Sequence, residues 1–126
     1  MGKGRTLVAV LLGILLLASC SQADTIDSTL SAAKQEGKVV MLELGSVGCV
    51  SCEQMRPVMS KLSETHKGRL EVIFVDVKKD PETGRRFGVY MIPVQVFLDK
   101  SGKEFHRHVG FYSYDDISAM LKKTGI

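Results

Sequence analysis

Apolar residues recur at two spacings along the chain, and each spacing predicts one kind of element. Short apolar runs that are rich in β-branched residues and bounded by glycine or polar turns predict strands at 39–44, 70–77, 94–98 and 104–109. Apolar residues three and four positions apart, preceded by a capping residue, predict helices. These helices cover 26–36 and 49–66, a short stretch that opens at 80–82 and ends at Gly88, and a last segment capped by Ser113, Asp115 and Asp116.

The order of these elements predicts an α/β fold. Helices and strands alternate as far as the third strand, which favours parallel pairing between strands. The turn cluster at 99–102 joins the last two strands, which are therefore expected to form an antiparallel hairpin. The chain contains no internal repeat and no second domain, so residues 26–126 are expected to form one domain.

The first 19 residues have the composition of a secretory signal peptide. Lys3 and Arg5 precede an apolar stretch at 7–18, which is too short to span a bilayer because a spanning helix needs about 20 residues. The stretch ends in Leu17-Ala18-Ser19-Cys20, which resembles the lipobox of bacterial lipoproteins. This resemblance implies that Cys20 is lipidated and becomes the first residue after cleavage, followed by a short polar tether that ends at residue 25. An ordinary signal peptide with a cysteine at its boundary is the alternative.

Charge and composition narrow the range of functions. The formal charge is +3 over 126 residues, and removal of the signal peptide takes Lys3 and Arg5 with it, which leaves 15 basic and 14 acidic side chains. Such a nearly neutral chain argues against nucleic-acid binding. A charged fraction of 25% without low-complexity runs argues against disorder. We expect a monomer, held by its lipid at the periplasmic face of a bacterial membrane, where disulfides form and persist.

The candidate chemistry lies in Cys49-Val50-Ser51-Cys52, directly after a predicted strand and at the start of a helix. The unpaired N–H groups and the positive dipole end of a helix N-terminus stabilise a thiolate. Cys49, at the exposed end, is therefore expected to have a depressed pKa and to be the attacking sulfur. Cys52 lies one turn further on and is expected to resolve the mixed disulfide by attacking Cys49. No organic cofactor is required, because the dithiol itself carries the electrons.

Other interpretations of the cysteine pair remain open on spacing alone. It could be half of a zinc site, a fixed structural disulfide or a chance occurrence. His106 and His108 alternate on one predicted strand and project to the same face, so that together with the cysteines they allow a copper- or zinc-handling alternative. A solvated histidine pair on an edge strand is the simpler interpretation, and we predict no metal site.

From Val39 to Lys123 the sequence resembles the thioredoxin-like superfamily. The resemblance rests on the strand before the cysteine pair, on Met55-Arg56-Pro57 after it, and on Ile92-Pro93, 41 residues after Cys52. It implies a three-layer α/β/α sandwich whose mixed sheet has a parallel centre and a C-terminal antiparallel hairpin. It also implies that Pro93 is cis and faces the cysteines, and that the backbone of Ile92 pairs with an extended substrate. Val50 and Ser51 complete the expected substrate-binding surface.

Within the superfamily, the sequence is most similar to the C-terminal domain of DsbD-type thiol:disulfide interchange proteins. The shared features are 40–44 before Cys-Val-x-Cys, and Gly102-Lys103-Glu104 leading to Val109-Gly110-Phe111. The resemblance implies a reductant of disulfide-bearing extracytoplasmic proteins that receives its electrons from a membrane donor of the DsbD type. A disulfide-forming oxidase, a metal-binding protein and a catalytically idle binding module are the alternatives, among which the fold cannot choose.

Two further positions are informative in the light of that resemblance. The family has a buried acid where this chain has Glu43, which could accept the proton of Cys52, although an outward-facing strand glutamate is the alternative. The strand pattern places Glu43 on the same face as Met41 without deciding between the two. The tryptophan that the family has before the first cysteine is Gly48 here, so a flat apolar surface beside the thiol is lost.

Overall fold

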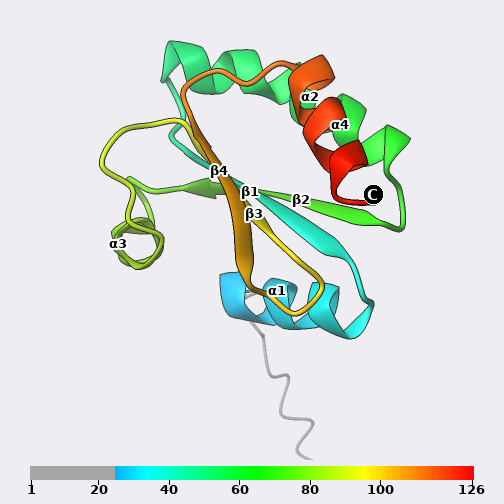
Figure 1. The fold of residues 1–126 in the computed structure, drawn as a ribbon. Coiled ribbons are helices and arrows are strands. Elements are labelled where there is room, and N and C mark those ends of the chain that lie inside the picture. Colours follow the sequence, from blue (N-terminus) through cyan, green and yellow to red (C-terminus); the bar gives the residue numbers. More distant parts are fainter. Residues whose placement is uncertain (1–24) are drawn as a thin grey trace, which may run out of the picture.

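The computed structural model describes residues 25–126, which form four helices and four strands in the predicted order (Figure 1). The elements are α1 (Ile26–Gln35), β1 (Val39–Gly45), α2 (Val50–Thr65), β2 (Leu70–Asp76), α3 (Pro81–Arg86), β3 (Val94–Leu98), β4 (Glu104–Val109) and α4 (Tyr114–Lys123). The signal peptide and Cys20 lie outside the described residues. Within residues 25–126, no helix has the length and apolar character that crossing a membrane requires.

Each helix begins at a residue whose side chain accepts a hydrogen bond from a backbone N–H of the first turn, which satisfies one of the free donors there. These capping residues are Thr25, Cys49, Asp80 and Ser113. Three of them are the usual hydroxyl or carboxylate groups, whereas Cys49 places a sulfur atom at the start of α2.

The sheet has the strand order β2-β1-β3-β4 and is mixed, as predicted. Strands β1 and β2 are parallel, and the hairpin β3–β4 is antiparallel, as expected. The central pair β1–β3 is also antiparallel, although parallel pairing was expected at the centre of the sheet. A parallel crossover would return the chain to the far edge of the sheet before the next strand begins. The connection 77–93 does not do so, since β3 begins beside the end of β1, where Val94 pairs with Leu44.

Helices cover both faces of the sheet, which gives the expected three-layer arrangement. In Figure 1, α2 and α4 lie on one face, and α1 lies on the opposite face together with α3. The side chains of β1 alternate between two cores: Val39 and Met41 join the core under α2 and α4, and Val40, Leu42 and Leu44 join the core over α1. Position 43 therefore faces α2 and α4.

Candidate active site at the Cys49–Cys52 pair

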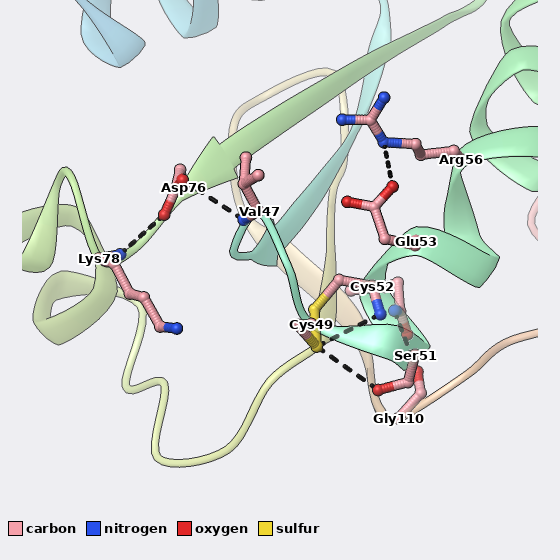
Figure 2. The surroundings of a disulfide bond; sticks show 10 residues. Val47, Cys49, Ser51, Cys52, Glu53, Arg56, Asp76, Lys78 and Gly110 are labelled. Atoms are coloured by element: carbon pink, nitrogen blue, oxygen red, sulfur yellow. Dashed lines mark hydrogen bonds and ion pairs between the residues drawn. A yellow bond between two sulfur atoms is a disulfide. The ribbon is translucent and has the colours of Figure 1, made fainter.

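Cys49 and Cys52 form a disulfide within the first turn of α2, with their Cα atoms 5.2 Å apart. Cys49 is half-buried, whereas Cys52 is only 4% exposed. The backbone N–H of Cys52 donates to Cys49 Sγ over 3.4 Å (Figure 2). The sulfur predicted to attack is therefore the more accessible one and receives a helix N–H, and the sulfur predicted to resolve is covered.

The two residues between the cysteines have different surroundings. Ser51 Oγ lies 3.6 Å from Cys49 Sγ, within hydrogen-bond range for sulfur, as Figure 2 shows. The side chain of Val50 is 78% exposed. Ser51 therefore contacts the sulfur itself, and Val50 presents an apolar surface to solvent next to it.

The loop that leads from β1 into α2 is held by close packing at Gly45 and by a hydrogen bond from Val47 to Asp76. Gly45 is the last residue of β1, and a Cβ atom at this position would lie 3.1 Å from Cys52 Sγ and 3.3 Å from the ring of Phe74. Gly48 has a φ of +82°, a conformation that favours glycine, so the family's tryptophan does not suit this backbone. The carboxylate of Asp76, at the end of β2, accepts hydrogen bonds from the N–H groups of Val47 and Lys78 (Figure 2).

Glu43 lies in the sheet below this loop and is 0% exposed, so the outward-facing alternative is wrong. Since side chains on one face of a strand recur every second residue, Glu43 and Gly45 share a face, and Cys52 packs against that face at Gly45. The strand partners of Glu43 are Phe74 on β2 and Gln95 on β3. Burial raises the pKa of Glu43 to about 7, and a hydrogen-bonding interaction with Gln95 partly opposes this increase.

Pro93 lies at the start of β3, next to the cysteines in the fold. The Ile92–Pro93 peptide bond is cis, as expected. The N–H of Gly110 donates to the Pro93 carbonyl over 2.8 Å, and Figure 2 includes Gly110 in the surroundings of the disulfide. The antiparallel pairing of β1 and β3 therefore brings Pro93 and the cysteine pair to one edge of the sheet.

The histidine pair does not join the cysteines in a metal site. His106 and His108 do share a face, since both rings pack on Tyr112. Their Nε2 atoms lie within hydrogen-bond distance of Tyr112 Oη and of the Phe111 carbonyl. Over residues 25–126, no three His, Cys, Asp or Glu side chains gather where they could hold a metal ion.

The sequence analysis missed two residues of this region, Gln95 and Gly45. Gln95 is the one polar residue in the predicted strand 94–98, and a polar residue within an apolar run is the signal that could have found it. From the sequence, Gly45 only bounds the strand 39–44 and begins the loop before the cysteines, and its close contact with Cys52 has no signature there.

This chain is similar to known proteins over about three quarters of its length. Residues 26–125 match a family model described as a thioredoxin-like domain. Thioredoxin of Bacillus subtilis (strain 168) is 29% identical over 97 residues, which are 77% of this chain and 91% of the relative. Thioredoxin of Alicyclobacillus acidocaldarius subsp. acidocaldarius is 28% identical over 95 residues, which are 75% and 90% of the two chains. The crystal structure of a poplar wild-type thioredoxin h superposes with a TM-score of 0.66 at 26% identity, and the match covers 75% of this chain and 86% of that one.

The close contact at Gly45 leads to a testable prediction. Gly45→Ala should lower the free energy of unfolding by about 1–3 kcal/mol, because the added methyl group overpacks the core, and it should also shift the reduction potential of the cysteine pair. Gly84→Ala is the matched control, since its Cβ would lie 3.2 Å from Val77, away from the disulfide. Urea denaturation should show a loss of stability in Gly45→Ala, and redox titration should show a shift in Gly45→Ala but not in Gly84→Ala. Equal potentials in the two variants would contradict this account of the contact.

Proposed function

The chain belongs to the thioredoxin-like family, and from that premise we propose that it reduces disulfide bonds of other proteins outside the cytoplasm. The observation that carries the proposal is the asymmetry of the disulfide at the start of α2, with Cys49 accessible and Cys52 buried. The similarity to proteins named thioredoxin supports the reducing direction.

The proposed reaction transfers two electrons from the dithiol to the substrate. The thiolate of Cys49 attacks one sulfur of the substrate disulfide, forms a mixed disulfide and releases the other substrate sulfur as a thiolate. Cys52 then loses its proton and attacks Cys49 Sγ, which releases the second substrate thiolate and leaves the Cys49–Cys52 disulfide. The N–H of Cys52 and the hydroxyl of Ser51 are placed to donate to the Cys49 thiolate.

The surface of the site suits an extended polypeptide. Neither the N–H nor the carbonyl of Ile92 makes a backbone hydrogen bond within residues 25–126, so both are free to pair with a substrate strand. Tyr90 and Met91, which precede Ile92 in the chain, are 96% and 67% exposed, and Val50 adds a further apolar side chain. We infer that a protein segment binds along Ile92 and Pro93 with its disulfide at Cys49.

We infer the location and the electron supply from two resemblances in the sequence. The lipobox at Cys20 supports lipid anchoring outside the cytoplasm. The likeness to the C-terminal domain of DsbD-type proteins supports a membrane dithiol of that type as the donor that returns the Cys49–Cys52 disulfide to the dithiol.

Substitution of the cysteines tests the reaction. With insulin as substrate and dithiothreitol as electron source, the wild-type chain should accelerate reduction, and Cys49→Ala should abolish the acceleration. Incubated with insulin after removal of dithiothreitol, reduced Cys52→Ala should instead accumulate a one-to-one mixed disulfide with the substrate, because no resolving sulfur is present. The reduction potential should lie near that of thioredoxin, about −270 mV. A potential near −120 mV would indicate an oxidase, and the absence of an adduct would exclude Cys49 as the nucleophile.

Replacement of Glu43 tests its proposed role as the acceptor of the Cys52 proton. Glu43→Gln should slow exchange by about tenfold or more and remove the rise in rate as the pH passes through about 7. The same variant should change the pH dependence of stability. Because the pKa of folded Glu43 lies above its ordinary value of 4.5, the folded state retains a proton that the unfolded state loses, and stability falls as the pH rises from 4.5 to about 7. That fall is on the order of 3 kcal/mol.

Urea denaturation of the oxidised protein at pH 5 and pH 8 measures the effect on stability. The exposed Glu64 gives a matched control, Glu64→Gln, which should keep both the rate profile and the pH dependence of stability. If Glu43→Gln matches the wild type in exchange rate between pH 6 and 9, the proton acceptor is another group.

Lipid anchoring is tested with the full chain expressed in a bacterium. The wild type should incorporate labelled fatty acid and partition into the detergent phase of Triton X-114, because acyl chains bind apolar phases strongly. Cys20→Ser should do neither. A wild-type chain that stays in the aqueous phase without label would show that the cysteine is an ordinary boundary residue.

A further inference from the structure

Gln95 is a buried amide within β3, and it has no role in the reaction proposed above. Its side chain is 0% exposed, and the other residues of the strand are Val94, Val96, Phe97 and Leu98. A buried amide without hydrogen bonds destabilises a fold, whereas an apolar residue of similar size would not. Its presence therefore calls for a specific partner.

The register of the sheet identifies that partner as Glu43. The two residues are directly paired between β1 and β3, and both are completely buried. Three of their polar atoms have no hydrogen-bond partner of good geometry within residues 25–126, namely both carboxyl oxygens of Glu43 and Oε1 of Gln95. A carboxyl group facing an amide can satisfy all three, since the O–H donates to Oε1 and an N–H of Nε2 donates to the other carboxyl oxygen.

The same amide also reaches the substrate edge. Gln95 Nε2 donates to the carbonyl of Gly110 over 3.1 Å, and the N–H of Gly110 donates to the Pro93 carbonyl over 2.8 Å. An amide nitrogen has two N–H donors, so one can hold Gly110 while the other holds the carboxyl group. Gln95 therefore lies between the buried acid and the strand end that carries the cis-proline.

No lysine or arginine side chain is buried with Glu43 as an alternative partner for its carboxyl group within residues 25–126. Glu43 is aligned with Phe74 on β2, and Cys52 of α2 packs on the same face of β1 at Gly45. No neighbouring charge shifts the pKa of Glu43, and Gln95 is the one side chain whose hydrogen bonding does so. Among residues 25–126, the buried polar side chains include no lysine and no arginine.

We propose that Gln95 is a positioning residue that holds the carboxyl group of Glu43 toward Cys52 and couples it to Gly110 and Pro93. This inference rests on the proposed function, since it deepens the role of Glu43. When Cys52 is deprotonated for resolution, its proton goes to a carboxyl oxygen of Glu43, and the new O–H donates to Gln95 Oε1. When Glu43 is ionised, Nε2 donates to the carboxylate, and this charge-assisted bond is the stronger of the two.

The variant Gln95→Met, of similar size but without the amide, tests the proposal. Loss of the stronger bond to the carboxylate should move the pH midpoint of thiol–disulfide exchange upward by about one unit and slow exchange at pH 7 several-fold. The infrared C=O band of protonated Glu43, assigned by its absence in Glu43→Gln, should shift to higher frequency because the carboxyl group loses its partner. In the Glu43→Gln background, Gln95→Met should leave the pH profile unchanged.

Thr83→Val is the matched control, since Thr83 is also a buried polar residue but bonds Asp80 in α3. It should leave the midpoint and the infrared band unchanged. Should Gln95→Met not fold, the wild type gives the answer by nuclear magnetic resonance, because the side-chain amide signals of Gln95 should titrate with the midpoint of Glu43. Amide signals that do not titrate, or a folded Gln95→Met variant with an unmoved midpoint and band, would overturn the proposal. The spectroscopic readouts are independent of insulin reduction, so they separate this outcome from failure of the proposed function.

Discussion

Strands β1 and β3 run side by side in opposite directions, so the end of β1 lies beside the beginning of β3. The cysteine pair follows one strand and Pro93 precedes the other, and only this pairing brings residues more than 40 positions apart to one edge. The same register aligns Glu43 with Gln95 below that edge. A parallel arrangement would have placed Pro93 at the far end of the sheet. The connection 77–93, which contains α3 and both leaves β2 and enters β3 at this edge, is therefore as important for the site as the residues that form it.

A second constraint acts at the scale of one helical turn. Cys49 and Cys52 lie one helical turn apart at the start of α2, yet one sulfur lies at the helix end near solvent and the other is packed against Gly45. Solvent and helix N–H groups stabilise charge on the first sulfur, and burial opposes charge on the second. The chemical difference between two identical side chains thus comes from the position of the helix end relative to the strand before it.

Much of this architecture could be predicted from the sequence because it depends on local patterns. The apolar run at 39–44 and the capping residues before 114 concern neighbouring residues, and the cysteine pair and Ile92-Pro93 are recognisable as motifs. The direction of β3 and the surroundings of Glu43 are harder to predict from the sequence, because both depend on contacts between distant segments. The strand pattern put Glu43 on one face but could not say that it is completely buried there and paired with Gln95. Gln95 was missed because its role depends on a register that no local pattern shows.

The conformation of Gly48 has a consequence for how substrates meet the thiol. The family's tryptophan is replaced by a residue whose backbone lies in the left-handed region and whose missing side chain would point into open space. A polypeptide bound as proposed would therefore meet, on this side of Cys49, a bare peptide group and not an aromatic ring. Its recognition there would depend on main-chain shape and hydrogen bonding, which are common to all proteins, so the loop would favour breadth of substrates over selection by side chain.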